Sequence, residues 1–176
     1  TVDSAGRVGL DSSLALDAAD RPRISYTEYL NNKLKYAAWN GSAWLYAYPD
    51  PGTDKGEYCS LALDASGNPH ISHYDTAQGD LRYAWNDGVW HADIVDDRLN
   101  DLGQYSSIAL DSGGLPRISY YDATVKQLMF ASFDGSTWTI DPTIDPAPNT
   151  GTFTSLAIRG DGKAVIAYYA SSTQDL

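Results

Sequence analysis

The segment Ser60-Leu61-Ala62-Leu63-Asp64 recurs three more times along the chain, and this repetition decides the fold. The four copies begin at Ser13, Ser60, Ser107 and Ser155, so the unit returns after 47, 47 and 48 residues. Self-similarity at this period is typical of arrays in which one structural unit stacks on the next.

Around this anchor, each unit contains short segments rich in branched and aromatic residues, which predicts four antiparallel strands, A to D. In the second unit these strands begin near Ser60, Pro69, Leu81 and Trp90. Turn sequences of the Asp/Asn-Gly type separate them, and such sequences favour tight hairpins. No helical periodicity is present.

A four-stranded unit of this size cannot cover both of its faces alone, whereas radial stacking of such units produces a propeller. We therefore predict an all-β fold class: a β-propeller of four-stranded antiparallel blades of about 47 residues, present here as an incomplete ring of about 3.7 blades. The chain is then one propeller segment. Its parts are the end of a preceding blade with its connection (1–12), three blades (13–50, 60–96 and 107–145) and a partial blade (155–176).

Both ends of the sequence match the middle of a blade. Thr1-Val2-Asp3 is similar to Ile94-Val95-Asp96 at the end of strand D, and Leu176 matches Leu81 at the start of strand C. An open ring would expose strand edges and apolar blade faces. We expect the remaining blades to come from the same longer protein or from another chain, with seven blades in total and six or eight as alternatives.

The composition excludes some partners. The chain has 23 acidic and 12 basic residues and a net charge of -11, which disfavours nucleic acid and anionic lipid. No apolar run is long enough to insert into a membrane, and the segment from Thr1 to Leu10 lacks the basic and apolar regions of a signal peptide. The single cysteine, Cys59, excludes an intrachain disulfide and fits a small buried position. We expect a secreted or cell-surface protein whose signal peptide has been removed.

The turn between strands C and D carries a family resemblance. Ser132-Phe133-Asp134-Gly135-Ser136-Thr137-Trp138 resembles the Asp-box of sialidase-like (BNR-repeat) propellers but is one residue short. The other units keep only the turn and its tryptophan. The units are also similar to those of fucose-binding propeller lectins, although no sugar-binding motif matches residue by residue. The resemblance implies the propeller fold, with the Asp-box as a structural turn.

No recognisable catalytic motif is present. A sialidase would need clustered arginines with a Tyr/Glu pair, yet only Arg7 and Arg98 are expected near the rim formed by the D-to-A and B-to-C connections. His70 and His73 lie three apart on one strand and so face opposite sides, which excludes a local chelating pair. We predict no catalytic residue, no metal site and no cofactor, and leave enzymatic activity undecided, with a non-catalytic role favoured.

Aromatic residues provide the candidate ligand site. Most of the 13 tyrosines and 5 tryptophans are expected to pack blade against blade. One set, however, falls where the D-to-A and B-to-C connections share a rim, and aromatic faces with carboxylates suit sugar rings and hydroxyls. The predicted ligand-binding residues are Tyr58, Tyr74, Asp75, Tyr105, Tyr121 and Asp122. The alternative is that these residues only seal the ring.

These observations predict a non-catalytic extracellular binding propeller with a carbohydrate or a protein as its ligand. The first alternative is a sialidase-like glycoside hydrolase whose catalytic residues lie partly outside this chain. The second is a structural module of a larger surface protein.

Overall fold

The computed structural model describes residues 1–142 and 144–176, and within them the regular structure is β-strand apart from one 3-10 turn, η1 (Tyr29–Asn31). Blade 1 contains β1 (Val8–Leu16), β2 (Pro22–Glu28), β3 (Lys33–Trp39) and β4 (Trp44–Ala47). Blade 2 contains β5 (Lys55–Leu63), β6 (Pro69–Asp75), β7 (Asp80–Asn86) and β8 (Trp90–Asp96). Blade 3 contains β9 (Leu102–Leu110), β10 (Pro116–Asp122), β11 (Gln127–Phe133) and β12 (Trp138–Asp141). A half-blade follows as β13 (Thr152–Ile158) and β14 (Ala164–Tyr169).

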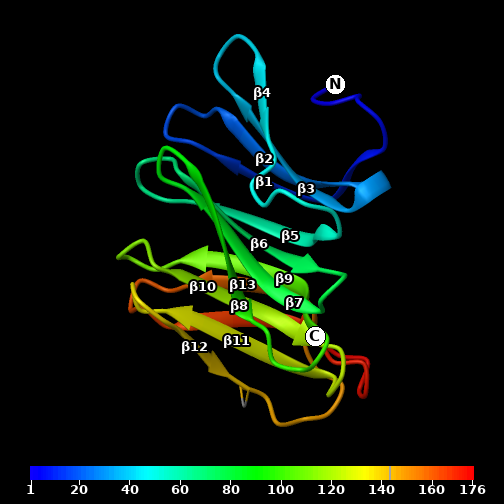
Figure 1. Cartoon of the computed structure of the whole chain (residues 1–176). Coiled ribbons are helices and arrows are strands. Elements are labelled where there is room, and N and C mark those ends of the chain that lie inside the picture. The colour runs from blue at the N-terminus through cyan, green and yellow to red at the C-terminus, as the bar shows by residue number, and fades with distance from the viewer. Residues whose placement is uncertain (143) are drawn as a thin grey trace.

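The strands of each blade pair antiparallel in chain order, and successive blades stack in an open arc (Figure 1). The first strands of the blades, β1, β5, β9 and β13, pack beside one another and form the inner edge of the arc. The turns between the first two strands are closed as predicted: Asp64 Oδ1 accepts hydrogen bonds from the Ser66 and Asn68 amides, both at 2.8 Å. The predicted all-β architecture of four-stranded blades is confirmed.

The inner strands begin earlier than the sequence pattern predicts. We expected strand A to start at the repeated serine, but β5 begins at Lys55 and β9 at Leu102. A register shift precedes each serine, and Tyr58 and Tyr105 lie at this bulge with φ of 52° and 53°. A bulge breaks the alternation from which strands are recognised, so the first part of each inner strand was taken for a connection.

Glycine marks the place where one blade crosses the next. A Cβ atom on Gly103 would lie 2.8 Å from Leu81 Cα, and one on Gly151 would lie 2.5 Å from Leu128 Cα. The equivalent Gly9 of blade 1 has no atom within 4 Å of such a Cβ. The inner strand of each later blade therefore passes so close to the third strand of the preceding blade that no side chain fits.

The repeated serine joins consecutive blades. In each of the three interfaces, which we call seams, its Oγ accepts a hydrogen bond from the backbone amide that follows the equivalent serine of the next blade. The bonds are Leu61 N to Ser13 Oγ at 3.0 Å, Ile108 N to Ser60 Oγ at 3.2 Å and Leu156 N to Ser107 Oγ at 3.0 Å. Without this acceptor a buried amide would remain unpaired, which explains why a serine suits the position.

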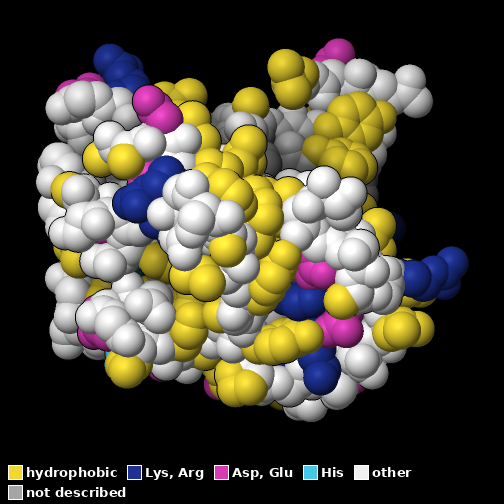
Figure 2. Space-filling view, turned by 90° about the horizontal axis from the view of Figure 1, so that it is seen from above, with side chains coloured by type: hydrophobic (Ala, Val, Ile, Leu, Met, Phe, Trp, Pro, Cys, Tyr) yellow, Lys and Arg dark blue, Asp and Glu magenta, His cyan; other side chains and the backbone are white. Residues whose placement is uncertain are grey.

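Blade 1 exposes a face whose equivalent is buried in each later blade. Leu14 is 64% exposed, whereas the equivalent Leu61, Ile108 and Leu156 are 7%, 6% and 9% exposed. Figure 2, which views the blade 1 end of the arc, shows hydrophobic side chains in a band across this face. The core lies in the seams, where each blade buries its inner strand against the one before.

Candidate functional site

Three aromatic side chains form a row on the inner edge of the arc. Tyr58, Tyr105 and Phe153 occupy equivalent positions in β5, β9 and β13, and their neighbouring ring centroids lie 4.6 and 4.5 Å apart. We call them the axial aromatic row. They line a groove of about 310 Å³ together with Asp11, the equivalent residue of blade 1.

The backbone under this row is unusual. Asp11, Tyr58, Tyr105 and Phe153 all have left-handed φ angles, between 48° and 56°. This conformation costs bulky residues about 1–3 kcal/mol each, so the surrounding structure must hold it in place. The next blade holds it through the residue that follows its own row member. Ser106 Oγ donates to the Tyr58 carbonyl at 2.9 Å, and Thr154 Oγ1 donates to the Tyr105 carbonyl at 2.8 Å.

Cys59 fills the same role in the first seam. Its thiol donates to the Asp11 carbonyl, with Sγ and O 2.9 Å apart, and lies 3.3 Å from Ser25 Oγ. Burial raises the pKa of this thiol to about 12. Cys59 is therefore a buried, unreactive hydrogen-bond donor.

The four predicted tyrosines come together. The Tyr74 ring lies 6.0 Å from that of Tyr58, and the Tyr121 ring lies 6.1 Å from that of Tyr105. Tyr74 is buried, and its hydroxyl donates to Asp101 Oδ1 at 2.6 Å, whereas Tyr58, Tyr105 and Tyr121 are half-buried. Phe153 and Asp11 were not among the predicted ligand-binding residues, although both occupy the third position of the same Gly-x-x-x-Ser segment as Tyr58 and Tyr105.

The two predicted aspartates serve the turns and are not exposed beside the rings. Asp75 and Asp122 are each 1% exposed. Asp75 Oδ1 accepts from the amides of Ala77 and Gln78, and Asp122 Oδ1 accepts from those of Thr124 and Val125. The structure therefore places both carboxylates in the turns between the second and third strands, where their Oδ1 atoms cap the turn.

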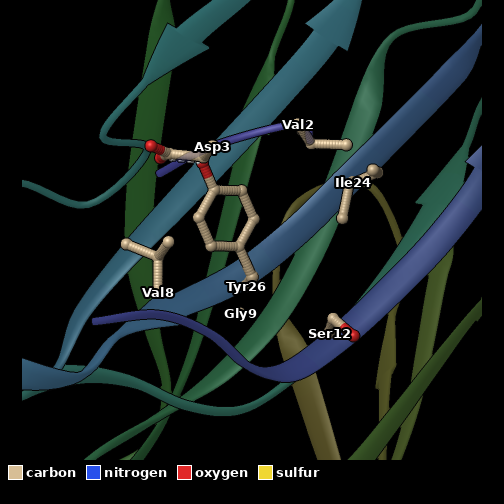
Figure 3. A pocket seen from close by; sticks show the side chains of 7 residues that line it. All are labelled: Val2, Asp3, Val8, Gly9, Ser12, Ile24 and Tyr26. Carbon is tan, nitrogen blue, oxygen red and sulfur yellow. Dashed lines mark hydrogen bonds between the residues drawn. The ribbon is translucent and has the colours of Figure 1, made fainter. Parts of the chain in front are cut away.

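Farther from the axis, an aspartate that precedes the inner strand of each blade contacts the second strand of that blade, and we call this contact the clasp. In blade 1, the Tyr26 hydroxyl donates to Asp3 Oδ2 at 2.7 Å, and the two side chains, which meet in Figure 3, line a pocket of about 230 Å³. In blade 3, the Tyr120 hydroxyl donates to Asp96 Oδ2 at 2.5 Å, while Arg98 pairs with the same carboxylate at 2.6 Å. In the half-blade, Tyr168 bonds to Asp145.

Blade 2 departs from this arrangement because His73 stands where the other blades have tyrosine. Its ring is fully buried, neither ring nitrogen makes a hydrogen bond, and Nε2 lies 3.6 Å from Asp50 Oδ2. Asp50 instead accepts from Arg82 Nε at 2.5 Å and lies 3.7 Å from Lys55 Nζ. Burial, with Arg82 and Lys55 acting in the same direction, lowers the pKa of His73 to about 3.

A second aromatic cleft lies on the opposite rim, between blades 1 and 2. Its volume is about 270 Å³, and its lining includes Arg23, Tyr36 and Trp90. The Tyr36 and Trp90 rings meet edge to face with centroids 5.3 Å apart. We expected these aromatics to pack between blades, and this contact confirms it. The cleft itself was not anticipated, because a seam brings together residues that are far apart in the sequence.

The arginines do not gather in one place. In the described part of the chain, all but Arg7 pair with an aspartate close by, and Arg7 lies over the Tyr29 ring at 5.1 Å. The pairs are Arg21 and Arg23 with Asp17, Arg82 with Asp50, Arg98 with Asp96, Arg117 with Asp111, and Arg159 with Asp161. This distribution gives no support to a sialidase-type arginine cluster within these residues. The same part of the chain contains no helix with the length and hydrophobicity to cross a lipid bilayer.

No protein-family model matches the sequence, and no curated protein matches it. Solved structures do match the fold. The SapL1 lectin has a TM-score of 0.66 at 16% identity, with 96% of this chain aligned to 59% of the lectin. A fucose lectin from Kordia zhangzhouensis has a TM-score of 0.52 at 19% identity, with 74% of this chain aligned to 96% of that lectin.

Two larger propellers also match. The six-bladed lectin of Aleuria aurantia has a TM-score of 0.59 at 17% identity, with 97% of this chain aligned to 56% of the lectin. The intramolecular trans-sialidase of Ruminococcus gnavus has a TM-score of 0.56 at 16% identity, with 93% of this chain aligned to 40% of the enzyme. This chain thus spans a little over half of the SapL1 and Aleuria lectins and less than half of the enzyme. It has the β-propeller fold found in fucose lectins and sialidase-like enzymes, as the repeat predicted.

Proposed function

We propose that this chain is part of a non-catalytic, extracellular carbohydrate-binding propeller, and that the ligand contacts the axial aromatic row. The half-buried Tyr121 extends this surface toward the rim where the D-to-A and B-to-C connections meet, and the buried Tyr74 packs beside Tyr58. The propeller fold of lectins supports a glycan ligand, with a protein ligand as the alternative outcome of the test.

The observation that carries the proposal is the left-handed backbone at three large aromatic residues. Glycine would adopt φ near 50° without strain, and asparagine would adopt it at little cost. Tyr58, Tyr105 and Phe153 stand there instead, with their rings beside an open groove. Strained backbone held in place by its surroundings is concentrated at ligand-binding positions.

The chemistry of the groove suits a sugar. Tyrosine rings provide flat apolar faces for the C–H groups of a pyranose, and their hydroxyls donate and accept hydrogen bonds. Asp11 adds a carboxylate acceptor beside the row, although one of its oxygens already accepts from the Tyr58 amide at 2.9 Å. The groove therefore offers apolar and polar contacts side by side.

A glycan array identifies the ligand, and calorimetry on two variants then locates it. Tyr105→Asn removes the central ring but keeps a residue that tolerates the left-handed backbone, as Asp11 does in blade 1. We expect it to weaken binding by at least about 1 kcal/mol, the loss typical of a central anchor. Val89→Ala, at an exposed turn on the opposite rim, is the control and should leave the affinity unchanged.

Loss of binding in Trp90→Ala with full binding in Tyr105→Asn would assign the glycan to the opposite cleft and reject the axial site. A blank array combined with capture of a defined protein would reject the glycan and favour the protein ligand. Turnover of any substrate in a chromogenic glycoside panel would favour the glycosidase.

A further inference from the structure

A third cleft lies on the rim of the D-to-A connections, at the edge of blade 2. Its volume is about 530 Å³, and it lies between the turn after β6 and the connection 97–101. The lining includes Gln78, Asp80, Asp97 and Arg98, but no member of the axial aromatic row. The cleft is thus separate from the groove described above.

Asp80 is the unusual residue of this cleft. It is only 8% exposed, and within the described part of the chain its carboxylate makes no hydrogen bond and no ion pair. Buried carboxylates are normally paired, because leaving the charge without a partner is costly. Burial, together with the negative charges of Asp75, Asp97 and Asp96, raises the pKa of Asp80, while Arg82 opposes this effect.

The charges around Asp80 are already engaged elsewhere. Arg98 pairs with Asp96 at 2.6 Å, and Arg82 donates to Asp50 at 2.5 Å. The carboxylate of Asp101 accepts from Tyr74 and Gln104. Asp97, which is exposed and lines the same cleft, adds a second carboxylate that makes no hydrogen bond or ion pair within the described residues. The cleft therefore presents two negative charges and no free cation of its own.

The other blades lack this carboxylate. The first residue of the third strand is Lys33 in β3 and Gln127 in β11, in the place that Asp80 takes in β7. In blade 1 the Lys33 ammonium lies over the Tyr48 ring at 5.6 Å. The acidic cleft is thus a feature of blade 2 and not a general property of the repeat.

We propose that this cleft binds the protonated amino group of an amino sugar, with Asp80 as the buried carboxylate that accepts its N–H donors. The inference rests on the proposed carbohydrate function and names a ligand class for a second subsite. An ammonium group supplies the missing positive charge, whereas a neutral sugar would leave Asp80 charged and uncompensated.

The test compares glucosamine with N-acetylglucosamine, which has the same ring without the positive charge, by calorimetry at pH 7. We expect glucosamine to bind the wild-type protein at least about tenfold more tightly, since a charge-assisted hydrogen bond contributes about this factor. Asp80→Asn should abolish the preference. Asp20→Asn is the control, because it removes one negative charge at an exposed left-handed turn position that asparagine tolerates.

Equal affinity for the two sugars, no binding of either, or a preference that survives Asp80→Asn would overturn the proposal. The carbohydrate function fails separately, only when the glycan array is also blank. Tyr105→Asn provides the reciprocal check: it should weaken the array-selected glycan but keep the preference for glucosamine.

Discussion

The seam between blades 1 and 2 and the seam between blades 2 and 3 share their inner hydrogen bonds but differ in their outer clasp. Near the axis, Ser13 and Ser60 each accept an amide of the next blade, at 3.0 and 3.2 Å. Farther out, Asp50 faces His73 and Arg82, whereas Asp96 faces Tyr120 and Arg98. Contacts to the backbone repeat closely, while contacts between side chains vary from seam to seam. One fold can therefore contain a proton-sensitive seam beside an insensitive one.

Removal of the clasp carboxylate should have the largest effect. Asp50→Ala removes the carboxylate 2.5 Å from the buried Arg82 and leaves it only Asp75, at 4.0 Å, and breaking a buried pair in this way costs about 3–5 kcal/mol. Asp96→Ala should cost less, because the Arg98 side chain is 44% exposed and can return to water, while the Arg82 side chain is only 11% exposed. Urea unfolding of both variants measures the difference, and equal losses would mean that the exposure of the cation does not matter.

Exchanging histidine and tyrosine at positions 73 and 120 should move the acid sensitivity of folding stability from one seam to the other. The folded-state pKa of His73, about 3, lies below its ordinary value of 6.5, so the unfolded chain binds the proton more readily. The contribution of His73 is thus fully present above pH 6.5 and is lost as the pH falls toward 3, by up to about 1.4 kcal/mol per pH unit.

His73→Tyr should flatten stability between pH 6.5 and 5, a difference of about 2 kcal/mol over that range. Tyr120→His should introduce the same slope in the second seam. Thermal unfolding across this pH range gives the answer, and a wild-type slope that persists in His73→Tyr would contradict the assignment.

Loss of a seam serine should have a smaller and nearly equal effect in both seams. Ser13→Ala and Ser60→Ala each leave one amide without its acceptor, at a cost of about 1–3 kcal/mol. Hydrogen exchange should accelerate at the Leu61 amide in the first variant and at the Ile108 amide in the second. Acceleration of both amides by either variant would show that the seams open together.

Replacement of Cys59 by serine should have the smallest effect on stability. The equivalent residue of the second seam, Ser106, already donates to the Tyr58 carbonyl of the preceding blade. Cys59→Ser should therefore keep the bond and alter the free energy of unfolding by less than about 0.5 kcal/mol. A loss above about 1 kcal/mol in urea unfolding would mean that the larger sulfur atom is needed for packing.

The sequence predicts the blades well because each blade repeats its own turn signals. The turn signals between the first two strands include Asp64 and Asp111, whose carboxylates cap those turns in the structure. The site was predicted less completely. Tyr58 and Tyr105 belong to the inner strands, but a bulge interrupts the alternation there, so the sequence pattern predicts a connection at these residues.

The contents of the seams could not be derived from one unit alone. Tyr36 of β3 and Trp90 of β8 meet only because two blades stack. Likewise, Asp75 and Asp122 were assigned to the ligand because an aspartate after a strand suits a turn and a sugar equally. Their burial decides for the turn.

The most direct test of the central claim is a chemical-shift map of the array-selected glycan on the isotope-labelled protein. The account predicts the largest amide shifts at Tyr58, Tyr105 and Phe153, with Val89 unaffected. Shifts centred on Arg23, Tyr36 and Trp90, with the axial aromatic row unchanged, would contradict it.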